Sequence, residues 1–127
     1  MKGNGEVDGS EFVQVGDRII NLSRIHCLKD SGSLLWVYFS GNDPAQLNGR
    51  FRDELLDAVN ERSDFMRIGE YIVPLSQINY MKDLDEELSI YTSRTHPIMA
   101  SGQIRAQVYK RLAIEPPVTP PPVFVRP

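Results

Sequence analysis

Apolar and polar residues alternate along the first forty positions, which predicts short β-strands. Residues 12–20 alternate on either side of Gly16-Asp17, a pair typical of a tight hairpin whose glycine takes a positive φ. Residues 24–29 predict the next strand, and residues 34–40 predict a strongly β-forming one. In this last strand Leu35 and Val37 would share one face, and Trp36 and Tyr38 the other, because successive side chains of a strand point to opposite sides.

The pattern then changes from a period of two residues to a helical period. Residues 45–47 predict an edge strand, and Asn48 is a residue type that caps helix starts. Beyond it, Phe51, Leu55 and Val59 recur at the i, i+4, i+8 spacing of one helical face. We therefore expect a helix that packs this stripe on the sheet.

The whole pattern occurs twice. A shift of 53 positions aligns FVQVGDRIINLSRIHCLKD with FMRIGEYIVPLSQINYMKD without a gap. The register continues to the second helix, where Ser101 is the counterpart of Asn48 and the stripe becomes Ile104, Val108 and Leu112. Identical pairs include Phe12/Phe65, Ile19/Ile72, Lys29/Lys82, Asp30/Asp83 and Arg52/Arg105.

These observations predict an α+β fold of two tandem duplicated β-rich units, each a β-hairpin plus strands closed by one helix. We expect unit 1 over residues 12–60 and unit 2 over 65–113, preceded by a flexible arm at 1–11 and followed by a Pro-rich tail at 115–127. Units of this size rarely bury enough apolar surface alone, and the connection between them is short. We therefore expect one domain in which the units pack as a pseudo-twofold body.

Composition and charge narrow the function classes. The chain has 127 residues, no apolar run long enough for a membrane span, one cysteine and no secretory signal, so we expect a cytoplasmic protein without membrane association. The 14 Lys and Arg residues face 17 Asp and Glu, which gives a net charge of −3. This balance disfavours nucleic acid as a partner, because phosphate binding usually needs a basic surplus.

No set of residues predicts catalysis, a metal or a cofactor. His26, Cys27 and His96 lack the spacing of zinc ligands, and Cys27 and His26 would point to opposite faces of one strand. The acidic residues 83–87 lack the pattern of a calcium loop, and no glycine-rich phosphate loop precedes a helix. We expect a protein that is not an enzyme.

Aromatic and proline residues suggest a binding surface instead. Trp36, Tyr38 and Tyr91 lie on the outer face of the predicted strands, although ordinary sheet packing would also explain them. The tail has the Pro117 to Pro120 spacing of a proline-groove ligand, and the segment around Phe124 could add a strand to a sheet edge, in cis or in trans. Our first hypothesis is a non-catalytic protein-interaction or regulatory module with a protein partner, and it leaves a homodimer open.

The second unit also resembles a known family. FMRIGEYIVPLSQINYMK resembles the Phe-x-Arg-x-His-Arg-Ser-Tyr-x-Val-Asn segment of LytTR-type DNA-binding domains of bacterial response regulators, with matches at Phe65, Arg67, Tyr71, Val73 and Ile78. The resemblance implies a β-rich scaffold that binds DNA. Gly69-Glu70 replaces the family's His-Arg-Ser, Pro74 replaces the Asn, and Gly102 lies near a basic contact of the family.

The alternative hypothesis is therefore a LytTR-like transcriptional regulator. Its contacts to DNA would come from Arg52, Arg67 and Arg105. These would form part of a basic face that also includes Arg50, Arg94, Lys110 and Arg111. Solvated surface charge is the competing interpretation of the same residues.

Overall fold

The computed structural model describes residues 11–41, 43–94 and 96–117. The N-terminal arm before Glu11 and the tail beyond Pro117 lie outside these residues. The first half runs through five strands, a 3-10 turn and one helix: β1 (Phe12–Val15), β2 (Arg18–Asn21), η1 (Leu22–Arg24), β3 (Ile25–Asp30), β4 (Leu34–Phe39), β5 (Ala45–Asn48) and α2 (Gly49–Asn60).

The second half has the same elements in the same order: β6 (Phe65–Ile68), β7 (Tyr71–Pro74), η2 (Leu75–Gln77), β8 (Ile78–Asp83), β9 (Glu87–Thr92), β10 (Ile98–Ser101) and α3 (Gly102–Leu112). The α+β class predicted from the sequence is thus confirmed. That the halves arose by duplication stays a prediction.

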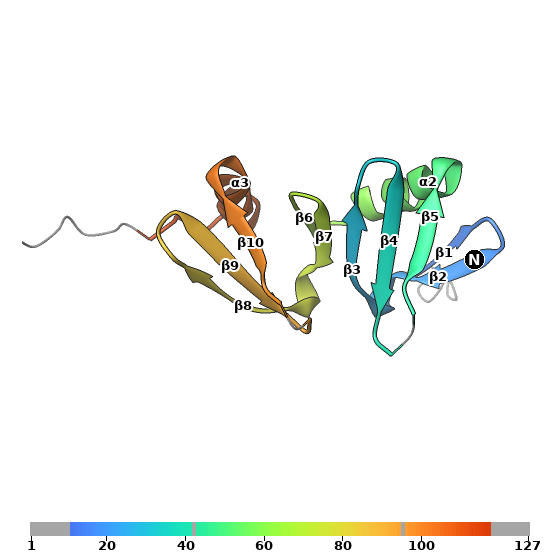
Figure 1. Cartoon of the computed structure of the whole chain (residues 1–127), viewed down its shortest axis with the longest axis horizontal. Coiled ribbons are helices and arrows are strands. Elements are labelled where there is room, and N and C mark those ends of the chain that lie inside the picture. Colours follow the sequence, from blue (N-terminus) through green and yellow to red (C-terminus); the bar gives the residue numbers. More distant parts are fainter. Residues whose placement is uncertain (1–10, 42, 95, 118–127) are drawn as a thin grey trace, which may run out of the picture.

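The strands form three antiparallel sheets that follow one another along a long axis (Figure 1). β1 and β2 form a hairpin at one end, the order β5-β4-β3-β7-β6 forms the central sheet, and β10-β9-β8 forms the sheet at the other end. The central sheet joins the halves, because β7 pairs with β3.

The expected pseudo-twofold packing does not match this strand order. A twofold axis would repeat the β3–β7 pairing as a pairing of β8 with β2, their counterparts in the other halves, whereas in the described chain β2 pairs only with β1. The halves therefore meet head to tail, with the hairpin of the second half extending the sheet of the first.

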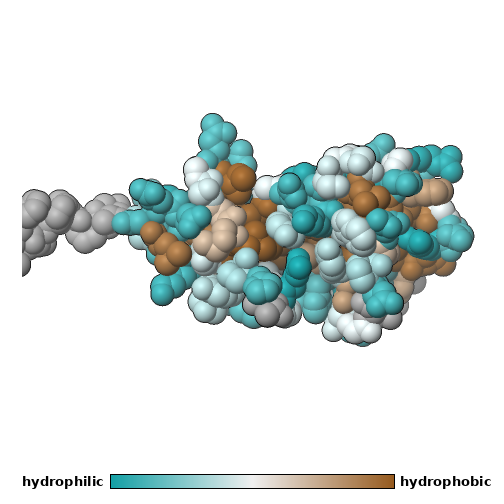
Figure 2. Space-filling model, viewed as in Figure 1, coloured by the Kyte–Doolittle hydropathy of each residue, from teal (hydrophilic) through white to brown (hydrophobic). Residues whose placement is uncertain are grey.

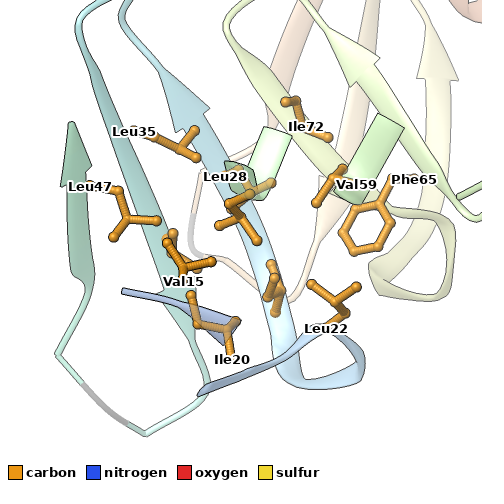
Figure 3. Packing of buried hydrophobic residues seen from close by; sticks show 12 residues of the cluster. Val15, Ile20, Leu22, Leu28, Leu35, Leu47, Val59, Phe65 and Ile72 are labelled. Carbon is orange, nitrogen blue, oxygen red and sulfur yellow. The ribbon is translucent and has the colours of Figure 1, made fainter. Parts of the chain in front are cut away.

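Two hydrophobic cores result from this arrangement. The first lies under α2 and contains Leu28, Leu55 and Val59, together with Phe65 and Ile72 from the second half (Figure 3). The second lies under α3 and contains Val108, together with Cys27 from the first half. Each core therefore needs residues from both halves, and we expect them to fold as one unit.

Strand β3 contributes fully buried side chains from both of its faces. Its pairing with β4 shifts between Ile25 and Cys27, and this bulge turns Cys27 toward the second core while Leu28 faces the first. Both side chains are fully buried. A bulge redirects side chains in this way, and alternation alone does not reveal it.

Both helices begin where the sequence predicted, but without the expected cap. Asn48 and Ser101 occupy the N-cap positions in extended conformation, and neither side chain makes a cap hydrogen bond. Each is also the last residue of an edge strand, with an exposed side chain. The chain turns into the helix at Gly49 and Gly102, which adopt φ values of +56° and +57° that favour glycine.

Candidate nucleic-acid interface

Arg52, the first of the three predicted DNA contacts, forms an intramolecular ion pair. Its Nε and Nη2 atoms each lie 3.0 Å from a carboxylate oxygen of Asp30. The Asp30 side chain is only 4% exposed, and it also accepts a hydrogen bond from the backbone N–H of Gly32. A two-pronged contact of this kind fixes the guanidinium in one orientation.

Arg105 makes the equivalent contact in the second half. Its Nη2 lies 2.6 Å from Oδ2 of Asp83, the counterpart of Asp30. Asp83 also accepts hydrogen bonds from the Tyr109 hydroxyl at 2.5 Å and from the backbone N–H of Asp85 at 2.7 Å. Asp30 and Arg52 are thus repeated as Asp83 and Arg105.

Both carboxylates are held in the charged form. Burial pushes the pKa of Asp30 upward, but hydrogen bonds from Gly32, Arg52 and Arg67 outweigh it and leave the pKa lowered. The hydroxyl of Tyr109 is the main cause of the lowered pKa of Asp83, and Arg105 adds to it. Burial, followed by this hydrogen bond to Asp83, raises the pKa of Tyr109.

Arg67 joins the first of these pairs across the junction. Its Nη2 lies 3.3 Å from Asp30, and its Nε donates to the carbonyl of Gly69. Arg67 is half exposed, whereas Arg52 and Arg105 are 20% and 18% exposed. The structure therefore places the three predicted DNA contacts in ion pairs within the chain. The sequence held a sign of this, because the acidic partner recurs wherever the arginine does.

The wider predicted basic face is also divided. Arg50 pairs with Glu54 on the exposed side of α2, and Arg111 donates to the carbonyls of Ser63 and Phe65 between the halves. Lys110 is exposed on α3. Arg111 lines a pocket together with Arg67, which contacts Asp30, whereas Arg50 lies on α2 and Lys110 on the exposed side of α3.

A different set of side chains forms a basic and aromatic surface, made of Lys29, Trp36, Tyr38, Tyr71 and Arg94. In the central sheet Lys29 pairs with Trp36 on one side and with Tyr71 on the other, so the three form a row across β4, β3 and β7. Tyr38 lies two residues from Trp36 on the same face. All five are partly exposed.

Two cations of this surface stack on its rings. The guanidinium of Arg94 lies 4.8 Å from the centre of the Tyr38 ring and 5.8 Å from that of Tyr71. The ammonium of Lys29 lies 5.8 Å from the Tyr71 ring. In the part of the chain that the structure describes, neither cation has a carboxylate partner. Lys29 and Tyr71 were missed as site residues, although Lys29 is identical to Lys82 in the repeat and Tyr71 belongs to the LytTR-like match.

Arg94 also contacts the cysteine. Its Nη1 lies 3.3 Å from Sγ of Cys27, a residue of the second core against which Tyr38 also packs. Burial raises the pKa of the Cys27 thiol more than the nearby guanidinium lowers it. The thiol is therefore neutral and inaccessible, unlike the exposed thiolate of a reactive cysteine.

The predicted partner-binding residues lie in three places. Trp36 and Tyr38 belong to the basic and aromatic surface. Tyr91 is stacked on Tyr80 of the neighbouring strand β8, with ring centres 4.5 Å apart. Pro117 is exposed beside α3, and Pro120 and Phe124 lie outside the described residues.

Neither a metal site nor a membrane span emerges from the described residues. Within 11–41, 43–94 and 96–117, no three His, Cys, Asp or Glu side chains gather as metal ligands would. Among the same residues, no helix has the length and apolar character needed to cross a membrane.

Comparisons with known proteins give a fold. No protein-family model matches the sequence, and no curated protein matches it. A solved structure that is similar over most of the chain is a LytTr DNA-binding domain of a Bacillus cereus response regulator. The TM-score is 0.61 at 13% sequence identity, and the match covers 81% of this chain and 95% of that one.

The fold is that of a LytTr DNA-binding domain. The resemblance predicted from residues 65–78 is thereby confirmed for the architecture. The LytTr-type fold spans both halves of this chain, and the basic and aromatic surface lies on its central sheet.

Proposed function

We propose that this chain is a non-catalytic module that binds duplex DNA through the basic and aromatic surface of its central sheet. The observation that carries the proposal is the match to nearly the whole length of a LytTr DNA-binding domain. The surface adds two cations, Lys29 and Arg94, that no carboxylate neutralises among the described residues. This proposal reverses the preference of the sequence analysis, which placed DNA second.

The chemistry of the surface suits a phosphate backbone. Lysine and arginine replace the counterions that surround DNA, and this release supplies most of the non-specific affinity. The rings of Tyr38 and Tyr71 hold the two cations in place, so less side-chain entropy is lost on binding. With only two such cations and a net charge of −3, we expect weak binding that falls steeply with salt.

Glu70 opposes this binding. It lies in the exposed turn between β6 and β7, and its carbonyl accepts a hydrogen bond from the backbone of Asp30, the neighbour of Lys29. A carboxylate at this end of the row repels phosphate. Replacing the charge in Glu70→Gln should therefore tighten binding without altering the fold.

The repeat supplies a matched control for the lysine. Lys29→Ala removes a cation from the proposed surface, and Lys82→Ala removes its counterpart from β8 in the other sheet. Fluorescence anisotropy with a labelled duplex over a range of salt concentrations should show weaker binding for Lys29→Ala alone. The slope of log K against log salt should also be shallower by about one phosphate contact. No salt-sensitive binding at low ionic strength, or equal losses in both variants, would contradict the proposal.

Trp36 gives an independent signal, because it is the single tryptophan of the chain and lies beside Lys29. DNA bound to this surface should change its emission, and the change should titrate with the anisotropy. Binding that leaves Trp36 emission unaltered would place the interface elsewhere.

A second candidate function is protein interaction, as the sequence analysis preferred. It is favoured by apolar and aromatic side chains that stay exposed at both ends of the molecule, including Ile19 and Tyr80.

A further inference from the structure

The pairing of β3 with β7 joins the two halves, and an equivalent pairing could form between two molecules. Strand β7 pairs antiparallel with β3, with Leu28 opposite Ile72 and Lys29 opposite Tyr71. The backbone N–H of Asp30 extends this pairing by donating to the carbonyl of Glu70 at 2.7 Å. The β6–β7 hairpin of the second half thus pairs with the edge of β3 that is not bonded to β4.

The first hairpin carries the same residues without such a partner. Phe65 and Ile72 of the second hairpin are 7% and 2% exposed in the first core (Figure 3). Their identical counterparts, Phe12 and Ile19, are 49% and 69% exposed. Hydrophobic side chains reach the surface at the end that β1 and β2 form (Figure 2). In the described chain, β2 pairs only with β1.

At the opposite end of the molecule, no hairpin formed by the described residues lies beside the sheet. Strand β8, the counterpart of β3, is the edge of the last sheet. Cys27 on β3 is fully buried by the second half, whereas its counterpart Tyr80 on β8 is 58% exposed. The described chain thus leaves β8 uncovered where β3 is covered.

A groove also lies beside β8. Its volume is about 330 Å³, and its lining includes Met81, Leu88 and Leu112. These are the counterparts of Leu28, Leu35 and Val59, which pack in the core that holds Phe65 and Ile72. The groove therefore has the lining that receives a Phe and an Ile elsewhere in the same molecule.

We propose that the occupant of this groove and edge is the β1–β2 hairpin of a second copy of the chain. The internal register, shifted by 53 positions, pairs Met81 with Ile19 and Lys82 with Arg18 of the next copy. The contact joins two different surfaces, so each copy offers a free end to another and the assembly grows head to tail.

One pair in this register weakens the contact. Lys29 faces Tyr71 inside the molecule, but Lys82 would face Arg18, and like charges directly opposite each other are unfavourable. We therefore expect association weaker than the internal junction, with the monomer dominant in dilute solution.

Sedimentation velocity of the full chain from about 1 μM to about 1 mM should show size increasing with concentration. Ile19→Lys should weaken association at least about tenfold, because it places a charge where an apolar side chain is buried. Met99→Lys is the matched control, since Met99 is 45% exposed on β10, at the edge opposite β8 of the sheet that β8 belongs to. Both positions are exposed, so both variants should fold, which circular dichroism checks.

Mixing two variants separates this contact from a symmetric dimer. Ile19→Lys leaves β8 intact, and Tyr80→Lys leaves the hairpin intact. Each variant alone should be monomeric, while an equimolar mixture should form a 1:1 complex that does not grow. A mixture that stays monomeric would overturn the proposal.

Charge exchange tests the register. Lys82→Glu places opposite charges across the contact and should tighten association by up to about fivefold. Adding Arg18→Glu to it should remove that gain. A Lys82→Glu variant that associates no more tightly than the unaltered chain would overturn the proposed register.

The Pro-rich tail is the alternative occupant to test, because Ile114, just before it, and Pro117, near its start, line the groove. A full chain that stays monomeric throughout the range, and associates only when residues 118–127 are removed, would show that the tail is the occupant and would overturn the proposal.

Discussion

Ile19 and Ile72 offer a direct test of how the halves pack, because they are the same residue at the same position of the repeat. Ile72 on β7 is 2% exposed and packs in the core under α2, although it belongs to the second half. Ile19 on β2 is 69% exposed. We expect Ile72→Ala to destabilise the protein strongly and Ile19→Ala to have little effect.

The magnitude follows from burial. Truncating a buried isoleucine to alanine costs about 2–5 kcal/mol, which combines the lost transfer free energy with the cavity left behind. Ile19→Ala creates no cavity, and its cost is limited to about 1 kcal/mol of strand preference, which Ile72→Ala also loses. The free energies of unfolding of the two variants should therefore differ by about 2 kcal/mol or more.

Urea denaturation followed by circular dichroism measures this difference, at a protein concentration where both variants are monomeric. The slope of the free energy of unfolding against urea concentration should be unchanged. One cooperative transition is expected because each core contains residues of both halves. Phe65→Ala against Phe12→Ala repeats the comparison with a second pair. Equal losses in Ile19→Ala and Ile72→Ala would refute the head-to-tail packing.

Three further predictions concern single residues. The lowered pKa of Asp30 means that its stabilising contribution is present above its unfolded value of 3.8 and is lost as pH falls through the folded value. Asp30→Asn should accordingly be less stable than the unaltered chain at pH 7, by a margin that shrinks in acid when unfolding is followed at both pH values. The Cys27 thiol, with its raised pKa and full burial, should react with iodoacetamide far more slowly than a free thiol until denaturant is added. Gly16→Ala should lower the melting temperature more than Gly49→Ala, because both positions have a positive φ but only a Cβ at Gly16 would meet another side chain, the Phe51 ring at 2.9 Å.

The order of elements was predictable from the sequence because local patterns encode it. Alternating residues around Gly16 and Gly69 gave the hairpins, and the stripes through Leu55 and Val108 gave the helices. The repeat supported each assignment with a second copy. The LytTR-like segment at residues 65–78 pointed to the architecture that the comparison of structures confirms.

The candidate site was only partly predictable. Arg52 and Arg105 looked like free basic residues, and the recurrence of Asp30 and Asp83 was the one sign that each has a partner 22 positions away. The row that joins Trp36, Lys29 and Tyr71 could not be predicted, because β7 belongs to the other half and its register with β3 is a long-range contact.

The sequence by itself determined the strands, the helices, their order and the faces that are apolar, since these depend on residues close together in the chain. Only the tertiary structure decided which half each hairpin joins. Phe12 and Phe65 are identical, yet one is exposed and the other is buried in the neighbouring half. Burial depends on what lies next to a side chain in space. The two hairpins differ in burial because β6–β7 pairs with the edge of β3, whereas β1–β2 lies at the end of the described chain.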